Sequence, residues 1–455
     1  IIIGGDKMFK KILIANRGEI AVRIIRACNE LGISTVAVYS EADKNSLHVK
    51  LADESYCIGK SSPKDTYLNI NNIINIAIHT KAEAIHPGYG FLSENTGFAK
   101  ACEEFNICFI GPNYTIIEKL GDKSNAKETM KKANVPIVPG SDGEIKDVDE
   151  SVKVAEKIGY PVIVKASAGG GGKGMRVAGN KDELINAIRE CEKEAGSYFG
   201  NSAVYLEKYL DHTRHVEIQV IGDNYGNVVY LGERDCTIQR RHQKLVEESP
   251  SPALNESLRK SMGEAAVNAS KAFKYNSVGT VEFLLNEDNN FYFMEMNTRI
   301  QVEHGVTEMV TGIDLIKEQI LVSCGNKLSF LQDDIKSNGC AIECRINAED
   351  PYNNFMPCPG QIDEYIASGG IGIRVDSAAY SGYIIPPFYD SMISKLVSWG
   401  RNREEAIERM KRALDEFIIC GVSTTIPFHR KLMDNKIFRS GDFDTGFLEY
   451  YKILE

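Results

Sequence analysis

Several features are missing from this sequence, and each absence excludes a class of protein. None of the eleven cysteines forms a C-x-x-C pair, and no Cys/His set has ligand spacing. We therefore expect reduced thiols, with neither a disulfide framework nor a zinc site. No apolar run reaches the roughly eighteen residues of a membrane-spanning helix, and the segment before Met8 is too short for a signal peptide. These absences predict a soluble, cytoplasmic protein with no membrane partner.

An excess of basic residues is also missing. The chain carries 53 Lys and Arg residues against 63 Asp and Glu residues, which gives a formal net charge of −10. Such a balance disfavours non-specific binding to nucleic acid. One basic cluster, QRRHQK at 239–244, has no aromatic residues between its charges and is followed closely by Glu247 and Glu248. We therefore expect no nucleic-acid partner.

Two common nucleotide-binding loops are absent. The first predicted strand, KILIAN, leads into RGE without a G-x-G-x-x-G turn, so dinucleotide binding is not expected there. A glycine run does occur at 169–174, but Gly174 follows Lys173 where a Walker loop has Ser or Thr, and a strand-like segment comes next. From the residues alone, this run is either a flexible surface hairpin or a stretch of backbone that must approach a ligand closely.

The apolar pattern that is present predicts an α/β fold in three regions. From residue 8 to 118, strand-length apolar runs alternate with segments of helical spacing, which indicates parallel βαβ units in a doubly wound domain. A second region at 119–330 contains an inserted α/β piece at about 138–210. A third, α+β region at 335–450 is expected to end with a helix over 402–419. The 455 residues suit about three domains of ordinary size.

The strongest polar pattern lies at 295–304, EMNTRIQVEH. Alternate residues of a strand share a face, and here five alternate residues are polar whereas Met296, Ile300 and Val302 between them are apolar. A straight strand would spread the polar groups over about 26 Å at about 3.3 Å per residue, too far for one small substrate. We therefore predict a bend near Thr298 that turns both halves toward one centre; an amphipathic edge strand is the alternative. The five polar residues are Glu295, Asn297, Arg299, Gln301 and Glu303.

A metal site is predicted beside this pattern. Glu282 stands alone among the apolar residues of TVEFLL, and burial of a lone carboxylate is costly unless a cation or hydrogen bonds compensate. Glu295 on a neighbouring strand and the amide oxygen of Asn297 would complete a set of hard oxygen ligands, which suits Mg²⁺ (or Mn²⁺) carrying nucleotide phosphates. A structural ion pair around Glu282 is the alternative.

Five stretches in constant order resemble the biotin carboxylases of the ATP-grasp superfamily. The stretches are ANRGEIA, HPGYGFLSEN, ERDCTIQRRHQK, EMNTRIQVEH and CRINAEDP, and the resemblance runs from about residue 8 to 450. It implies an N-terminal doubly wound domain, a central ATP-grasp domain with a mobile lid at about 138–210, and a C-terminal α+β domain. The sequence departs from the family pattern at two positions: Ala168, where the family often has glycine, and Gly305, where it usually has proline. We expect Gly305 to loosen the segment that holds Glu303.

The resemblance implies an ATP site beneath the lid. Backbone N–H groups of the lid glycines would approach the phosphates, and Lys123 and Lys165 would bind the α- and β-phosphates. The adenine would lie at the hinge formed by Glu207, Lys208 and Leu210. The full set implied for ATP is Lys123, Lys165, Gly171, Gly172, Glu207, Lys208, Leu210, His215, Gln239, His242, Glu282 and Glu295.

The reaction implied by the resemblance converts ATP, bicarbonate and biotin into ADP, phosphate and carboxybiotin. Glu303 would take the bicarbonate proton, and Arg345 would bind biotin and stabilise its ureido oxyanion. The implied catalytic residues are Lys244, Arg299, Glu303 and Arg345, and the implied bicarbonate ligands are Lys244, Arg299, Gln301 and Val302. Two alternatives stay open: a carbamoyl-phosphate-type synthetase that transfers the same intermediate to ammonia, and a nucleotide-binding regulatory subunit without turnover.

The resemblance also implies partners. The sequence contains no Met-Lys-Met, the motif that usually presents biotin, so we expect a separate biotin carboxyl carrier protein to supply it. Carboxyltransferase subunits and a homodimer are further expectations. The implied assembly is an acetyl-CoA carboxylase of fatty acid synthesis; a split pyruvate carboxylase or another acyl-CoA carboxylase is the alternative.

Overall fold

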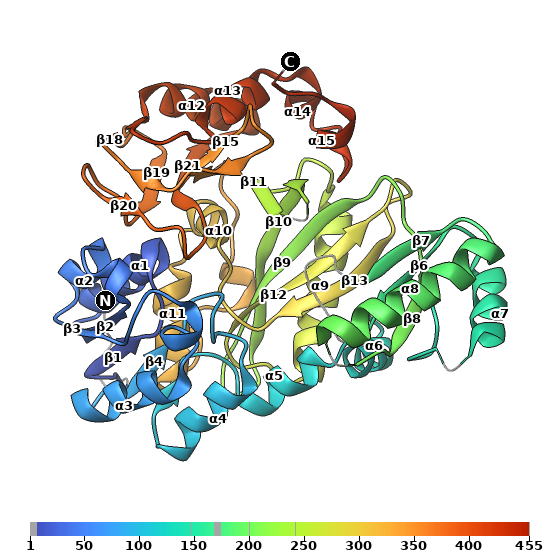
Figure 1. The fold of residues 1–455 in the computed structure, drawn as a ribbon, viewed down its shortest axis with the longest axis horizontal. Helices are drawn as coiled ribbons and strands as arrows, with labels where there is room; N and C mark the ends of the chain where they lie inside the picture. The colour runs from blue at the N-terminus through green and yellow to red at the C-terminus, as the bar shows by residue number, and fades with distance from the viewer. Residues whose placement is uncertain (1–6, 146, 168–173, 200, 242, 455) are drawn as a thin grey trace.

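The computed structural model describes residues 7–145, 147–167, 174–199, 201–241 and 243–454. Figure 1 shows the N-terminal region in blue at the left, the C-terminal region in red across the top and a green helical piece at the right of a central sheet. Within the described ranges, none of the helices combines the length and apolarity that a membrane crossing requires. All eleven cysteines are described and carry free thiols, as expected.

The N-terminal region is a parallel sheet with helices on both faces, as predicted. Its strands lie in the order β3-β2-β1-β4-β5, and neighbouring strands pair in parallel. Its elements are β1 (Lys11–Ile14), β2 (Ser34–Tyr39), β3 (Glu54–Cys57), β4 (Ala84–His86), β5 (Cys108–Phe109), α1 (Gly18–Glu30), α2 (Leu47–Leu51), α3 (Ile70–Thr80) and α4 (Thr96–Glu104). Because successive residues of a strand point to opposite faces, Ile12 and Ile14 pack with α1 whereas Leu13 packs with α3 and α4.

One antiparallel sheet of eight strands forms the centre of the molecule. Its order is β13-β12-β9-β10-β11-β14-β21-β19. The strands are β9 (Arg214–Gly222), β10 (Val228–Arg240), β11 (Gln243–Ser249), β12 (Val278–Leu285), β13 (Phe291–Asn297), β14 (Cys340–Asn347), β19 (Ile373–Ser377) and β21 (Met392–Gly400). Strands of the second and third regions therefore share one sheet, and the limits 8–118, 119–330 and 335–450 stay predictions.

Helices of the second region surround this sheet. They are α5 (Tyr114–Gly121), α6 (Lys123–Lys132), α9 (Glu256–Ala272), α10 (His304–Thr311) and α11 (Leu315–Ser323). Helix α9 packs its buried alanines and Met262 against β9 and β12. Helix α11 packs on α1 of the N-terminal region, so the first two regions share an apolar contact.

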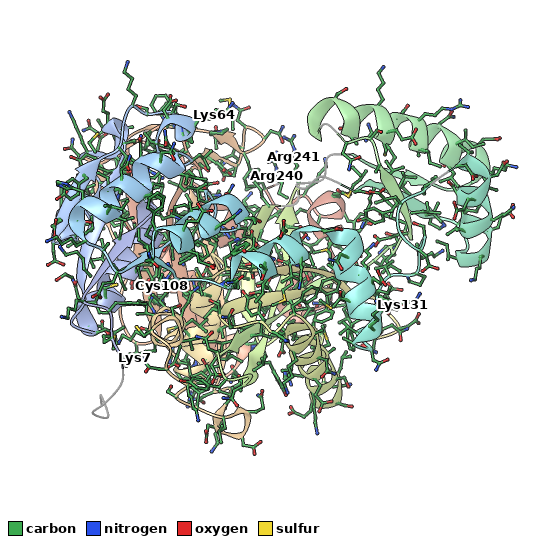
Figure 2. The ribbon with its side chains drawn as sticks, turned by 90° about the horizontal axis from the view of Figure 1, so that it is seen from below. Lys7, Lys64, Cys108, Lys131, Arg240 and Arg241 are labelled. Carbon is green, nitrogen blue, oxygen red and sulfur yellow. The ribbon has the colours of Figure 1, made fainter. Side chains whose placement is uncertain are left out.

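The inserted piece is a small sheet with two helices. Its strands β6 (Val162–Ala166), β7 (Met175–Ala178) and β8 (Val204–Lys208) pair antiparallel in the order β7-β6-β8. Helices α7 (Val148–Ile158) and α8 (Lys181–Phe199) cover one side and share an apolar core with it. Figure 2 shows this piece projecting from the rest of the molecule. The glycine run therefore connects two strands, as predicted, although residues 168–173 themselves lie outside the described ranges.

The third region does not end with the helix that the sequence predicted as its last element. The expected helix is α12 (Arg403–Glu416), but the chain continues through β22 (Ile418–Cys420), α13 (Ile426–Asp434), α14 (Lys436–Ser440) and α15 (Phe447–Tyr450). Phe428, Leu432 and Phe438 of these short elements pack with Met410 of α12 in one core. Helices this short fill less than one window of about 11–18 residues, so helical periodicity does not reveal them. Short strands complete the region: β15 (Glu349–Asp350), β16 (Met356–Pro357), β17 (Gly360–Gln361), β18 (Glu364–Ile366) and β20 (Ile384–Ile385).

Candidate active site

A large cleft of about 1540 Å³ lies between the central sheet, the inserted piece and the C-terminal segment. Most of the predicted site residues line it, although they come from separate strands and loops. These residues are Lys165, Glu207, Leu210, His215, Gln239, Lys244, Glu282, Glu295, Asn297, Arg299, Gln301, Val302, Glu303 and Arg345. The structure thus brings the expected set together; the role of each residue stays a prediction.

The other predicted residues are placed differently. Outside the described residues lie Ala168, Gly171, Gly172, His242 and the side chain of Lys123. Lys208, the last residue of β8, turns its side chain toward the turn between α7 and β6, where Nζ donates to the carbonyl oxygens of Gly159 and Tyr160, both at 3.0 Å. An adenine bound at this hinge would therefore contact the backbone of residue 208 rather than its ammonium group.

The chain bends after β13, as predicted. The strand ends at Asn297, and Glu303 is the N-cap residue of α10. Glu94 from the N-terminal region fixes the bend, since its carboxylate accepts hydrogen bonds from the Thr298 backbone at 3.0 Å and from Arg299 Nε at 2.9 Å. Although β13 is the edge strand of its sheet, its polar residues face the cleft together with those after the bend.

Lys244 on β11 is the centre of the charged cluster in the cleft. Its Nζ lies 2.6 Å from Glu217, 2.6 Å from Glu303 and 3.2 Å from Glu282. Burial by itself would lower the pKa of Lys244, but the surrounding carboxylates raise it well above its ordinary value. Lys244 is therefore a permanent cation, surrounded by acids from three different segments, and it can bind a small anion in the cleft.

Glu303 is a buried carboxylate held by cations on both of its oxygens. Lys244 Nζ donates to Oε1 at 2.6 Å, and Arg345 Nη2 donates to Oε2 at 2.9 Å. Burial would raise the pKa of Glu303, but the charges of Lys244 and Arg345 hold it well below its ordinary value. Glu303 is therefore ionised.

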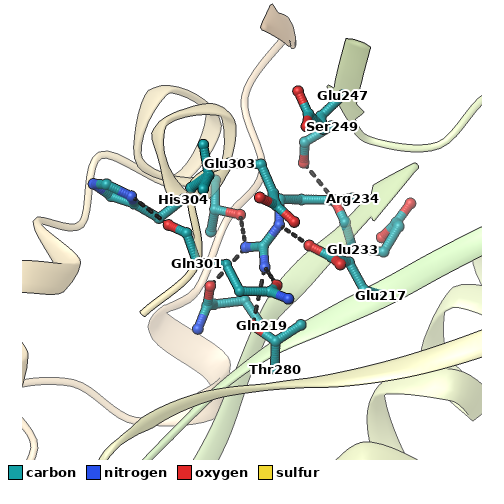
Figure 3. A network of polar contacts seen from close by, with 12 residues as sticks. Glu217, Gln219, Glu233, Arg234, Glu247, Ser249, Thr280, Gln301, Glu303 and His304 are labelled. Atoms are coloured by element: carbon teal, nitrogen blue, oxygen red, sulfur yellow. Dashed lines mark hydrogen bonds and ion pairs between the residues drawn. The ribbon is translucent and has the colours of Figure 1, made fainter. Parts of the chain in front are cut away.

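Arg234 lies beneath this cluster and was not predicted as a site residue. It is fully buried, and its five donors reach Glu217, Gln219, Thr280, Gln301 and Thr307 (Figure 3). Gln301 is thus fixed between Arg234, at 2.8 Å, and Glu282, at 2.8 Å. A signal for this network was present in β9, where Glu217 and Gln219 alternate with apolar Val216, Ile218 and Val220 and therefore share one face of the strand.

The predicted metal ligands have a suitable chemistry. Glu282 and Glu295 pair directly across β12 and β13, and both line the cleft. Burial would raise the pKa of Glu282, but Lys244 and His215 hold it well below its ordinary value, so it is ionised as a hard oxygen ligand must be. Asn297 donates its amide nitrogen to Glu282 at 2.8 Å, and its oxygen would serve as a ligand only after the amide turned over. The carboxylates of Glu282 and Glu295 are suitable ligands for Mg²⁺. The structural ion pair that was the alternative is also present, between Glu282 and Lys244.

Two lysines converge on Glu207 at the opposite end of the cleft. Lys165 Nζ lies 2.6 Å from the Glu207 carboxylate, and Lys127 donates to its other oxygen. Two cations beside one buried acid leave a net positive charge, which suits a phosphate group. Lys127 was not predicted, because it stands in a helix rich in lysine where nothing in the sequence separates it from its neighbours.

Gly305 lies in the first turn of α10, next to buried Glu343. A Cβ at this position would lie 3.0 Å from Glu343 Oε2 and 3.4 Å from Val397. Any larger residue at 305 therefore requires the Glu343 carboxyl to shift. Glu303 itself is held through its side chain by Lys244 and Arg345. The loosening of this segment that was expected from Gly305 stays a prediction.

Three sequence families match successive parts of the chain. Residues 8–117 match the biotin carboxylase N-terminal domain, residues 122–331 match the ATP-binding domain of the carbamoyl-phosphate synthase L chain, and residues 343–450 match the biotin carboxylase C-terminal domain.

Similar proteins cover nearly the whole chain. Biotin carboxylase 1 of Bacillus subtilis (strain 168) is 62% identical over 448 residues, 98% of this chain and 100% of that protein. The biotin carboxylase of Nostoc sp. (strain PCC 7120) is 56% identical over 97% of this chain and 99% of that protein. Among solved structures, the biotin carboxylase domain dimer of 2-oxoglutarate carboxylase from Hydrogenobacter thermophilus, in complex with MgADP, ADP and bicarbonate, has a TM-score of 0.94 at 53% identity and 99% coverage of both chains.

Proposed function

The chain belongs to the biotin carboxylase family of ATP-dependent carboxylating ligases, and from this premise we propose that it makes carboxybiotin for an acetyl-CoA carboxylase from ATP, bicarbonate and biotin. The observation that carries the proposal is the arrangement around Lys244 and Glu303. Glu303, proposed as the base, contacts both Lys244, proposed to bind the anion, and Arg345, proposed to bind biotin, and all three line the same cleft.

Bicarbonate activation would take place between Lys244, Arg299 and Glu303. Bicarbonate is a poor nucleophile, so it needs both a site for its negative charge and a base for its proton. Arg299 offers a planar pair of donors that matches a carboxylate-like anion. Glu303 accepts the bicarbonate proton, the freed oxygen bonds to the γ-phosphorus of ATP, and the bond to ADP breaks to give carboxyphosphate. Mg²⁺ bound by Glu282 and Glu295 would neutralise charge on the phosphates.

Transfer to biotin would take place beside Arg345. Carboxyphosphate splits into carbon dioxide and phosphate, and this phosphate takes the proton from the ureido nitrogen. The nitrogen then attacks carbon dioxide while negative charge develops on the ureido oxygen. Arg345 lines the cleft and remains cationic, since its two carboxylate neighbours raise its pKa against the opposite effect of burial. It can therefore stabilise that oxygen.

ADP release tests the proposed activity directly. With saturating Mg²⁺ and ATP, we expect release to depend on bicarbonate and to rise further when free biotin is added, with carboxybiotin as the product. Ammonia-dependent formation of carbamoyl phosphate would instead favour the synthetase alternative, which the biotin carboxylase domains on both sides of the shared ATP-binding domain disfavour. ATP binding without any bicarbonate-dependent turnover would favour the regulatory protein.

The carboxyl acceptor is the second part of the proposal. Acetyl-CoA is proposed because proteins named simply biotin carboxylase are among the most similar relatives, but subunits of pyruvate and 2-oxoglutarate carboxylases are similar over their length as well. We further propose a biotin carboxyl carrier protein and carboxyltransferase subunits as partners, and a homodimer like the one named for the Hydrogenobacter domain.

Native purification tests the acceptor. The complex isolated through a tag on this chain is supplied with labelled bicarbonate, Mg²⁺ and ATP. We expect acid-stable label to form with acetyl-CoA and not with pyruvate or 2-oxoglutarate. Label formed with pyruvate instead would assign the chain to a split pyruvate carboxylase, and the same complex without any acceptor serves as the control.

A further inference from the structure

The guanidinium group of Arg345 is held along one of its edges. Nε lies 2.7 Å and Nη2 lies 2.5 Å from the same oxygen, Oε1 of Glu247, while Nη2 also donates to Glu303 at 2.9 Å. Among the described residues, no hydrogen-bond or ion-pair partner contacts Nη1. Two contacts to one carboxylate fix the plane of the group as well as its distance. The edge that carries Nη1 is therefore the one that remains for a substrate.

The backbone of Arg345 is fixed from the C-terminal region. Its carbonyl oxygen accepts hydrogen bonds from Thr425 Oγ1 and from His429 Nε2, both at 2.9 Å. Burial lowers the pKa of His429 to about 4, so this histidine is neutral and acts as a fixed donor at neutral pH. Because the backbone is anchored, rotation of the side chain is the freedom that remains, and Glu247 restricts it.

Glu247 itself does not reach the cleft. It is fully buried on β11, opposite Glu343 of β14, and it is not among the residues that line the cleft. In the sequence, Glu247 was notable only as a negative charge beside a basic cluster. Glu247 cannot touch a substrate in the cleft, so any effect on the reaction must pass through Arg345.

We propose that Glu247 is a positioning residue for carboxyl transfer to biotin, holding the Nε and Nη2 edge of Arg345 so that Nη1 faces the ureido oxygen. The inference rests on the proposed function, because it assumes that Arg345 acts on biotin. Glu247 lies behind the cleft, and its charge rather than its bulk sets the orientation of the Arg345 guanidinium group.

The charged groups around Glu247 make its protonation state adjustable. Arg345 and Glu343 face it from β14, Glu303 from the segment before α10, and Lys244 lies on its own strand. Burial, opposed by Arg345 and assisted by Glu303, raises the pKa of Glu247 to about 7. Loss of the negative charge below this pH would release the Nε and Nη2 edge, because a neutral acid attracts a guanidinium group far less than a carboxylate does.

Glu247→Gln removes the charge and keeps the size of the side chain. We expect kcat/KM for free biotin to fall by about 10- to 100-fold, the usual cost of one hydrogen bond to a charged group, while bicarbonate-dependent ADP release without biotin changes little. The matched control is Glu248→Gln. Glu248 is the next residue of β11, is also buried, and pairs with Arg403 away from the cleft, so this variant should keep the wild-type kcat/KM for biotin.

The pH dependence separates positioning from a general loss of structure. The ratio of wild-type to Glu247→Gln activity should be largest above pH 7 and approach one as the pH falls through about 7. The ratio falls toward one at low pH because a protonated Glu247 is neutral like glutamine. A ratio independent of pH, or a Glu248→Gln variant with the same loss, would overturn the proposal.

A double-mutant cycle tests whether the effect passes through Arg345. In an Arg345→Ser background, Glu247→Gln should cause no further loss of carboxylation, because the group that it orients is already gone. An undiminished loss in that background would overturn the proposal. If Glu247→Gln does not fold, Glu247→Asp, which withdraws the carboxylate from Arg345 by one methylene, enters the same cycle. Absence of carboxybiotin with the wild-type chain would instead contradict the proposed function.

Discussion

Glu303→Gln is expected to abolish bicarbonate-dependent ADP release and biotin carboxylation together. Removal of the bicarbonate proton comes before every later step, and glutamine has the size of glutamate but cannot accept that proton. Loss of a general base costs about 10²- to 10⁴-fold in rate, and both activities should fall by the same factor. The measurement is ADP release and carboxybiotin formation at saturating ATP, on the same preparation of each protein.

The structure supplies a control for the loss of a buried charge. Glu233 is also buried and paired with an arginine, Arg259, at 2.9 Å, but it does not line the cleft. Glu233→Gln should therefore lower stability without removing either activity. Lys244 keeps Glu217 and Glu282 as partners in the Glu303→Gln variant, so we expect it to fold and to bind ATP. Carboxybiotin formed at the wild-type rate by Glu303→Gln would show that another group takes the bicarbonate proton.

The part of the site that lies within one segment could be predicted from the sequence. Alternation of polar and apolar residues at 295–303 identified polar side chains that line the cleft, although Met296 and Val302 between them line it as well. The spread of these polar groups over too long a distance required the bend that follows Asn297. The pairing of Glu282 with Glu295 could be anticipated as well, because a lone acid in an apolar strand needs a polar neighbour. Such arguments depend only on the period of a strand and on the cost of burial.

Contacts between distant segments could not be predicted in this way. The period of a strand shows which face a residue occupies, but not which strand lies beside it. Glu94 on the bend, Arg234 beneath Gln301 and Glu247 behind Arg345 each depend on that pairing. The single sheet that joins the second and third regions was missed for the same reason, since β11 and β14 are paired across a long stretch of intervening chain. In the sequence, these charged residues cannot be distinguished from residues exposed to solvent, because their partners lie far away along the chain.

Arg345→Ser is expected to separate the two halves of the reaction. The ureido oxyanion forms only after carboxyphosphate exists, so loss of its donor should leave the earlier step in place. We expect carboxylation to fall by about 10²- to 10³-fold, the usual cost of one oxyanion donor, while slow bicarbonate-dependent ADP release persists. Glu303 loses one of the two cations on its carboxylate in this variant. Its pKa should therefore rise toward the ordinary value, which makes it a better base rather than a worse one.

The matched control for this variant is Arg403→Ser. Arg403 is also largely buried and holds a glutamate of β11, Glu248, at 2.5 Å, but it lies outside the cleft. Its removal should reduce stability and leave the ratio of carboxybiotin to ADP unchanged, whereas Arg345→Ser should lower that ratio sharply. If Arg345→Ser lost ADP release and carboxylation by the same factor while it stayed folded and bound ATP, Arg345 would act on bicarbonate rather than on biotin. The contact of Arg345 with Glu303 would then serve the first half-reaction, because Arg345 would be needed to hold Glu303 in contact with bicarbonate.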